Sequence, residues 1–367
     1  MLYRTVLIEP ERLMKERLTR VIRNTPNFEL IGWYAEPDEA IADAEKIKPE
    51  VILVDIEEEK GLKGVDRLKQ TFPKAILICL SRQWDSEEQA RLIRAGASGY
   101  MIKPFTGAEL AEAVQTFSLT HLGDRSEVIT FFSPKGKSGK TTLVSNLAAA
   151  VAEKVNEPVA IIDADFQFGD QSVFLNLRPQ STITEAVRDI DFLSPVTLKS
   201  YFVKVNDNLH VLCGASKPEQ VDVVTIDKFT RLINMVKSLY RYVLIDMPSG
   251  FSDITATACE LSTRTILMTM YNGGYEVVHM KRALEIFKAW DDYEKRVDIL
   301  FTRLVPGQET QEKFSQLMGY PVKYIIPNAY NLVSESADNG RLAINEDETD
   351  PFSQAILAMA DSLVAHE

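Results

Sequence analysis

Short apolar runs alternate with amphipathic stretches of helical period along almost the whole chain. Because this alternation is typical of strands that are each followed by a helix, the pattern predicts βαβ units and parallel sheets. The helix before the fifth strand should end near Gly96, since glycine suits the position after a last helical turn. Five strands are expected in the first 120 residues, at 5–9, 28–34, 51–55, 75–80 and 99–102.

A polar stretch at 120–126 interrupts this series, and a second series of apolar runs follows it. We therefore predict an α/β protein with two doubly wound domains, at residues 1–119 and 127–367, joined by a linker at 120–126. The second domain should have a mostly parallel sheet and end in a helix that starts at Pro351. Its seven expected strands lie at 127–133, 158–163, 209–214, 241–246, 263–270, 297–302 and 322–326.

The composition and net charge of the chain disfavour several classes of partner and site. The 367 residues are 45% apolar and carry a net charge of −12, which disfavours nucleic acid or an anionic membrane as the default partner. The three cysteines are far apart, and Cys79 and Cys213 lie in apolar runs, so we expect buried thiols and no metal cluster. No basic segment with an apolar core opens the chain and no apolar run could span a bilayer. These features predict a cytoplasmic protein without direct membrane insertion.

The loop after the first strand of the second domain has the context of a phosphate-binding loop, because a strand precedes it and a strong helix follows. Backbone N–H groups at the start of that helix, together with its dipole, favour an anion. Lys140 is expected to reach the β- and γ-phosphates of a nucleotide, and the Thr141 hydroxyl to hold Mg²⁺. Glycines allow the backbone to curl around the anion. The candidate loop consists of Pro134, Lys135, Gly136, Lys137, Ser138, Gly139, Lys140, Thr141 and Thr142.

The lysine at the start of this loop gives it a family resemblance. The sequence K-G-K-S-G-K-T-T resembles the deviant Walker A motif of the MinD/ParA ATPases, K-G-G-x-G-K-T-T. The resemblance implies ATP as ligand, a homodimer with ATP near the interface, and a Lys135 that contacts the partner's phosphates as an arginine finger does. Lys137 departs from the family's second glycine and would cost about 1 kcal/mol if its φ is positive. Its ammonium either faces solvent or lies near polyphosphate.

Acidic residues at two further strand ends agree with this family. Asp163 and Asp165 lie at the carboxyl end of the strand at 158–163, and Asp246 ends the strand at 241–246, where ligands gather in α/β sheets. By resemblance, Asp165 orients the attacking water, Asp163 serves the Mg²⁺ shell, and Asp246 holds Mg²⁺ through a water as a Walker B residue. Gly250 resembles the family's second switch and could offer an N–H to the γ-phosphate. The implied enzyme is a Mg²⁺-dependent ATPase with low turnover.

Recognition of the base is less defined by the sequence. Pro327 matches the loop that commonly borders the adenine in this family. The family often has an asparagine after the strand that matches 297–302, whereas Thr302 and Arg303 stand there in this chain. The sequence therefore leaves the mode of base recognition open.

The first domain resembles a CheY-like receiver. Asp55, Ser81 and Lys103 follow the third, fourth and fifth strands and match the phosphoacceptor, hydroxyl and lysine of that family, a sensible set for a carboxylate nucleophile. Receivers also bind Mg²⁺ through an acidic pair after the first strand, but the pair here is Glu9 and Pro10. The loss of one oxygen ligand should weaken Mg²⁺ binding. We therefore expect a degenerate receiver used for docking, with a slow phosphoacceptor as the alternative.

A receiver-like domain ahead of a MinD/ParA ATPase is the arrangement of the TadZ/CpaE group, which organises the assembly machinery of Flp/Tad-type pili, and residues 165–179 are similar to that group. The resemblance implies a slow ATP-dependent dimerisation switch. Its partners would be pilus and secretion proteins that recruit it to the cell pole or membrane. Two alternatives compete: a ParA-type DNA-partition ATPase, and a non-hydrolysing ATP-bound scaffold or receiver-regulated signalling protein. A membrane-seeking MinD is disfavoured, since no lysine or arginine follows Arg341.

Overall fold

The computed structural model describes most of the chain and divides it into two compact units. The linker predicted at 120–126 falls outside the described residues except for Ser126. The described residues are 2–57, 59–83, 85–119, 126–193, 195–215, 223–272, 274–305 and 310–365. The first unit comprises residues 1–125, 189–200 and 234–239, and the second comprises 126–188, 201–233 and 240–367.

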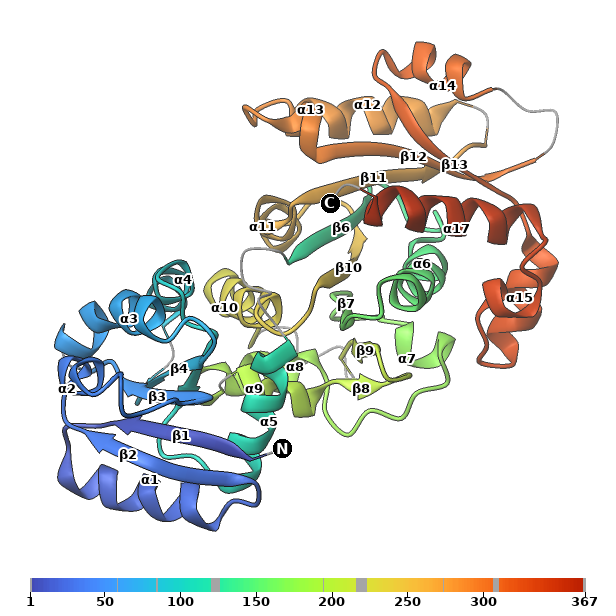
Figure 1. Cartoon of the computed structure of the whole chain (residues 1–367). Helices are drawn as coiled ribbons and strands as arrows, with labels where there is room; N and C mark the ends of the chain where they lie inside the picture. The colour runs from blue at the N-terminus through green and yellow to red at the C-terminus, as the bar shows by residue number, and fades with distance from the viewer. Residues whose placement is uncertain are drawn as a thin grey trace. The chain divides into compact units, whose positions relative to one another are not determined.

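The first unit contains a five-stranded parallel sheet with the strand order β2-β1-β3-β4-β5 (Figure 1). All five expected strands are present, each within two residues of its expected bounds. The third strand is entirely buried, as expected for the centre of a sheet covered on both faces. The strands are β1 (Tyr3–Ile8), β2 (Phe28–Tyr34), β3 (Val51–Asp55), β4 (Ile76–Ser81) and β5 (Gly99–Ile102).

Helices cover both faces of this sheet. Two of them, α1 and α5, pack on one face, where Leu18, Ile22 and Phe117 join the apolar side chains of the strands in one cluster. At the carboxyl ends of the strands lie the buried charged side chains Glu9, Asp55 and Lys103. The helices are α1 (Arg12–Asn24), α2 (Pro37–Ala42), α3 (Glu59–Thr71), α4 (Ser86–Arg94) and α5 (Gly107–Leu119).

The second unit contains an eight-stranded sheet with the order β13-β12-β11-β6-β10-β7-β9-β8. All seven expected strands are present, and every pairing is parallel except that of β8 with β9. The short strand β8 was not expected. The strands are β6 (Glu127–Ser133), β7 (Val159–Asp163), β8 (Val203–Lys204), β9 (Leu209–Leu212), β10 (Tyr242–Ser249), β11 (Arg264–Met270), β12 (Val297–Leu304) and β13 (Val322–Pro327).

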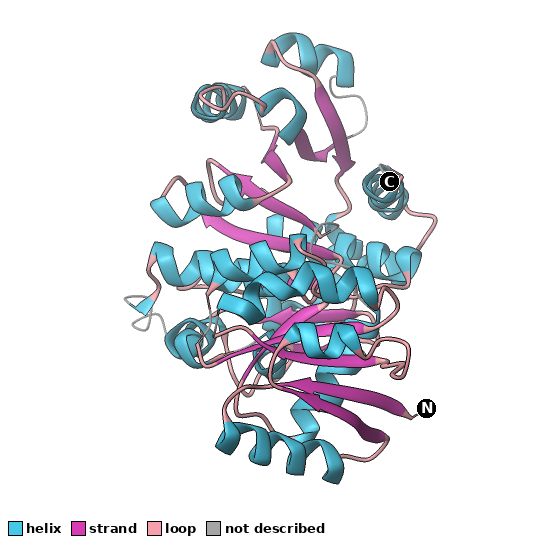
Figure 2. Cartoon of the chain, turned by 60° about the vertical axis from the view of Figure 1, so that its left-hand side comes forward, coloured by secondary structure: helices cyan, strands magenta, loops and turns pink. Residues whose placement is uncertain are grey.

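Helices also lie on both faces of the second sheet, as Figure 2 shows by colour. The alanine-rich helix α6 has ten buried residues because it lies between the strands and α17. The helix expected at Pro351 is α17, where the Asp350 carboxylate accepts the Phe352 N–H at 2.8 Å. The helices from residue 126 onward are α6 (Lys140–Val155), α7 (Gln171–Phe174), α8 (Ile183–Asp189), α9 (Pro195–Leu198), α10 (Ile226–Lys237), α11 (Asp253–Leu261), α12 (Tyr275–Phe287), α13 (Tyr293–Arg296), α14 (Gln311–Met318), α15 (Tyr330–Asp338), α16 (Ala343–Glu346) and α17 (Pro351–Val364).

The predicted fold class, two α/β domains with parallel or mostly parallel sheets, is confirmed. Cys79, Cys213 and Cys259 are free and buried. Among the described helices, none combines the length and the apolar character that crossing a membrane requires.

A buried glutamine joins α6 to two strands of the second sheet. Gln171, the first residue of α7, is fully buried. Its side chain donates to Asp246 Oδ2 at 3.0 Å and accepts the Ser145 hydroxyl of α6 at 2.8 Å, and its backbone N–H donates to Asp163 Oδ2 at 3.1 Å. Because a buried carboxylate without donors is costly, this one residue both connects three elements and lowers the cost of burying two aspartates.

We predict that Gln171→Ala lowers the free energy of unfolding by about 3 kcal/mol, because the buried Asp246 carboxylate loses a donor, while the Ser145 hydroxyl keeps only the Thr141 carbonyl as acceptor. Urea denaturation of the full chain measures this change. The matched control is Gln167→Ala, since Gln167 is exposed four residues earlier and should change stability by no more than about 0.5 kcal/mol. Equal urea midpoints for Gln171→Ala and the control would contradict the role of the bridge.

Candidate functional site

The candidate phosphate loop lies at the carboxyl edge of the second sheet. It follows β6, which pairs with β10 on one side and β11 on the other, and it leads directly into α6. The backbone N–H groups of the first turn of α6 have no partners within the helix, so this helix start favours an anion. The structure thus gives residues 134–142 the strand, loop and helix context that the sequence predicted.

Two residues with positive φ shape the loop. Gly139 precedes α6 at φ 77°, and Lys137 stands at φ 64°, the left-handed region in which a lysine costs about 1 kcal/mol. The Ser133 hydroxyl donates to the Lys135 carbonyl at 2.7 Å and closes the entry of the loop. Lys135, Gly136 and Lys137 are exposed. The loop therefore presents its first lysine and its unexpected lysine to the outside.

The C-terminal part of the candidate phosphate loop contacts β10. Lys140 Nζ donates to the Ser249 hydroxyl at 3.1 Å, and the Thr141 side chain is hydrogen-bonded to the Asp246 carboxylate. Burial lowers the pKa of Lys140, against the opposing attraction of Asp246 and Asp165. The structure therefore brings the predicted lysine, threonine and strand-end aspartate to one place.

Asp163 ends β7 and is paired in register with Asp246 of the neighbouring strand β10, which continues to Ser249. Both are buried, and burial together with the nearby second carboxylate raises the pKa of Asp163 well above its ordinary value. Asp163 accepts backbone N–H groups of Asp165 and Gln171, and Gly169 packs so closely that a methyl group there would lie 2.5 Å from its carboxylate. Both carboxylate oxygens of Asp163 thus accept backbone N–H groups, whereas Asp246 contacts Thr141 at the end of the candidate phosphate loop.

Asp165 lies at the start of the turn after β7 and is partly exposed. Its Oδ1 accepts the backbone N–H groups of Gln167 at 3.3 Å and Phe168 at 3.0 Å. In the described part of the chain, no group of three or more histidines, cysteines and carboxylates is arranged to hold a metal ion. A metal at this edge would therefore need the threonine hydroxyl, water or ligand oxygens as well as Asp246.

Gly250 follows β10 at φ 88°, a conformation that glycine adopts without strain. Its N–H donates to the Ser133 carbonyl at 3.1 Å. Offering this N–H to a phosphate, as the sequence suggested, requires that bond to break. The Ser138 hydroxyl, in contrast, is buried and has no hydrogen-bond partner among the described residues, so no existing bond would have to break for it to contact a phosphate.

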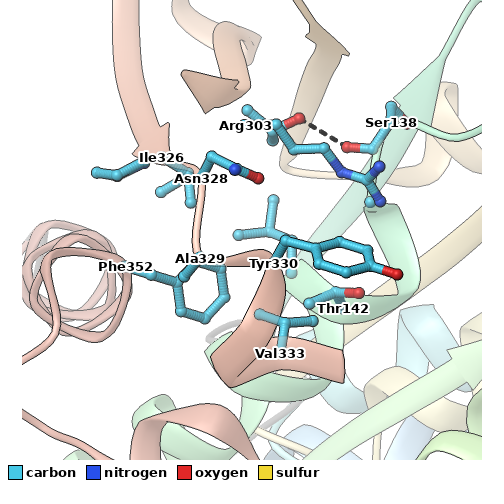
Figure 3. Close-up of a pocket in the computed structure, with 13 residues that line it drawn as sticks. Ser138, Thr142, Arg303, Ile326, Asn328, Ala329, Tyr330, Val333 and Phe352 are labelled. Atoms are coloured by element: carbon cyan, nitrogen blue, oxygen red, sulfur yellow. Dashed lines mark hydrogen bonds between the residues drawn. The ribbon is translucent and has the colours of Figure 1, made fainter. Parts of the chain in front are cut away.

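A pocket opens beside the loop and encloses about 440 Å³, open solvent included (Figure 3). Gly139 and Thr142 line one side of it, and Pro327 at the end of β13 lines another. Figure 3 shows the Arg303 guanidinium and the Tyr330 ring pointing toward the side of Thr142. The complete lining is Ser138, Gly139, Thr142, Leu143, Thr302, Arg303, Ile326, Pro327, Asn328, Ala329, Tyr330, Val333 and Phe352.

The β12 end of this pocket is fixed to the phosphate loop. Thr302 is buried and its hydroxyl donates to the Ser138 carbonyl at 2.7 Å. Arg303 stands at φ 57°, which turns its side chain back toward the loop, where its Nε lies 3.6 Å from the position of a methyl group on Gly139. Tyr330 is 70% exposed at the start of α15. The sequence did not assign Tyr330 or Gln171 to the site, because no motif gives either residue a chemical role.

The receiver-like residues of the first unit also meet at the carboxyl edge of their sheet. Lys103 forms ion pairs with Asp55 and with Glu9, the latter at 3.0 Å, and all three are buried. Burial alone would lower the pKa of Lys103, but the two carboxylates more than offset it and raise the pKa. Burial raises the pKa of Glu9 despite Lys103. Ser81, also buried, lies on the neighbouring strand and donates to Glu57, a residue that sequence reasoning did not select.

Two known families match consecutive parts of the chain. Residues 5–115 match the response regulator receiver domain, and residues 126–288 match a family described as an AAA domain. Response regulator GacA of Pseudomonas viridiflava is 28% identical over 124 residues, which are 33% of this chain and 56% of that protein. The chain thus spans about half the length of the curated response regulators it matches.

The second unit is similar to MinD proteins. Septum site-determining protein MinD of a Synechocystis species is 26% identical over 235 residues, which are 60% of this chain and 83% of that protein. The solved structure of MinD complexed with Mg-ADP from Pyrococcus horikoshii has the same fold, with a TM-score of 0.57 and 21% identity over 66% of this chain and 98% of that one. Together these findings show that the chain carries a receiver domain followed by a P-loop ATPase domain of the MinD/ParA type.

Proposed function

We propose that this chain is a Mg²⁺-dependent ATPase that dimerises around ATP and acts as an assembly switch. The observation that carries the proposal is the meeting of Lys140, Thr141 and Asp246 beside one helix start. A cation, a hydroxyl and a carboxylate around free N–H groups are the groups that a magnesium triphosphate requires.

The residues present fit ATP and Mg²⁺. The phosphates would contact the N–H groups of residues 136–141, with Lys140 beside them and the unpartnered Ser138 hydroxyl available as a further donor. Thr141 and Asp246 would hold Mg²⁺, which neutralises phosphate charge when bound. The base would enter the pocket bordered by Pro327, Arg303 and Tyr330. The relative from Pyrococcus horikoshii, whose structure contains Mg-ADP, supports this ligand class.

Asp165 is the proposed residue that orients the attacking water. It is partly exposed at the same edge of the sheet, and its attraction to Lys140 places it near the phosphate loop. Its Oδ1 accepts two backbone N–H groups, which hold the side chain in place. Asp163, buried under Gly169, would position the turn that carries Asp165 and act only indirectly on the metal.

The cellular role follows from the order of the domains. A receiver domain ahead of a MinD/ParA-type ATPase, with the 165–179 stretch described above, supports a TadZ/CpaE-like role in organising Flp/Tad-type pilus assembly. In that role the protein is cytoplasmic and reaches the cell pole or membrane through partner proteins. In that role, ATP binding and hydrolysis change the assembly state of the protein.

A ParA-type partition role is the second candidate, because the ATPase domain is of the same type. DNA binding by such a dimer would need a basic surface, which the net charge of −12 disfavours. A third candidate, a scaffold that binds ATP without hydrolysing it, differs from the main proposal only in turnover.

We predict that Lys140→Ala weakens ATP binding at least 100-fold, or about 3 kcal/mol, because the phosphates lose their main side-chain cation. Isothermal titration calorimetry with MgATP measures the affinity. Lys137→Ala is the matched control, since Lys137 lies exposed in the same loop, and its affinity should stay within a few-fold of wild type. Unchanged affinity in Lys140→Ala would refute the phosphate loop.

We predict that Lys135→Ala binds ATP nearly normally but fails to form the ATP-dependent dimer. The reason is that Lys135 is exposed at the entry of the loop, where its side chain is available to a second subunit, as the family resemblance implies. Sedimentation velocity with and without MgATP measures dimerisation. Equal ATP-dependent dimerisation of wild type and variant would count against a lysine acting across the interface.

Single-turnover hydrolysis separates a switch from a scaffold. We expect Asp165→Ala to hydrolyse ATP at least 100-fold more slowly than wild type while it binds ATP with similar affinity, as for removal of a general base. Asp170→Ala is the control, because Asp170 is exposed in the same turn and makes no cap bond. Absence of hydrolysis by wild type would instead favour the scaffold, and a DNA mobility shift that salt abolishes would favour partition.

A further inference from the structure

Glu57 lies two residues after Asp55, at the carboxyl edge of the first sheet. Glu57 is exposed, yet its Oε1 accepts the Ser81 hydroxyl at 2.6 Å and also the backbone N–H of Arg82. One carboxylate oxygen thus takes both donors that the start of the loop after β4 presents. Charge-assisted hydrogen bonds of this kind are about twice as strong as neutral ones.

Neighbouring contacts show that Ser81 donates and Glu57 accepts in this hydrogen bond. The Gln83 N–H donates to Ser81 Oγ at 3.3 Å, so the serine oxygen is an acceptor there and its own hydrogen points to Glu57. The Tyr100 hydroxyl of β5 donates to the Gln83 carbonyl at 2.6 Å and anchors the turn. The donors that face Glu57 are therefore held by β4 and β5 and do not depend on Glu57 for their position.

Both oxygens of Asp55 are engaged at the same time. Oδ1 accepts the backbone N–H of Glu57 at 3.1 Å, and Oδ2 is paired with Lys103. A phosphoryl group on Asp55 would carry three acceptor oxygens, and its donors would be the Ser81 hydroxyl, the adjacent Arg82 N–H and Lys103. Glu57 already occupies two of these three donors with a negative charge.

We propose that Glu57 acts as an internal anion that fills the phosphoryl position of the receiver, so that the domain keeps its charged arrangement without phosphorylation. The Glu57 carboxylate then excludes a phosphoryl group from Asp55 by occupying its donors and by like-charge repulsion. Although burial opposes it, bonding to Ser81 and Arg82 lowers the pKa of Glu57, consistent with an ionised group. This inference concerns the first unit alone and does not depend on the ATPase proposal.

The test uses the full chain without nucleotide and beryllofluoride, an analogue of the phosphoryl group, in excess Mg²⁺. Bound beryllofluoride is measured by fluorine NMR. We expect Glu57→Ala to bind it at least tenfold more tightly than wild type, because the donors become available, and Glu57→Gln to be intermediate since it keeps an acceptor but loses the charge. The double variant Asp55→Asn/Glu57→Ala should lose this binding, which assigns the signal to Asp55 rather than to the phosphate loop.

Two results would overturn the proposal. If wild type binds beryllofluoride as tightly as Glu57→Ala, the Glu57 carboxylate does not block the site. If neither protein binds it, the missing acidic residue at Pro10 rather than Glu57 prevents phosphoryl binding. Because Glu57 is exposed, neither single variant should alter the thermal unfolding midpoint by more than a few degrees, and this control shows that the receiver remains folded.

Discussion

Burial of carboxylates at the carboxyl edges of two parallel sheets is the constraint on which both sites of this protein depend. Parallel strands all end on one edge, so residues that are distant in sequence, such as Asp163 and Asp246, become neighbours there. An ionised group removed from water costs several kcal/mol unless a counter-charge or donors compensate it. How each unit supplies that compensation determines what its site can do.

The two units compensate the cost of burying their carboxylates in different ways. In the receiver, Lys103 lies between Glu9 and Asp55, and Glu57 accepts hydrogen bonds from Ser81 and Arg82, so each buried carboxylate faces a cation or hydrogen-bond donors, although burial still raises the pKa of Glu9. In the ATPase domain, Gln171 offers a neutral amide to Asp246, and burial raises the pKa of that carboxylate because compensation is incomplete. On the proposed function, the incomplete balance is what a magnesium ion bound with ATP would correct.

The sequence was sufficient for the fold class and for most strands, because buried parallel strands are continuous apolar runs that turns and helices separate. It did not indicate β8, since Val203–Lys204 is too short to show a period and pairs only at the sheet edge. It located the phosphate loop through a local motif. Gln171 and Glu57 could not be found in that way, because their roles depend on partners on other strands and helices.

The proposed function requires that residues 134–142 bind a triphosphate through backbone N–H groups at the start of α6. A crystal structure of the full chain with Mg²⁺ and a non-hydrolysable ATP analogue tests this most directly. We expect phosphates against residues 136–141, Lys140 beside them, and Mg²⁺ near Thr141 and Asp246. A loop without nucleotide under saturating conditions, or phosphates bound elsewhere on the chain, would contradict it.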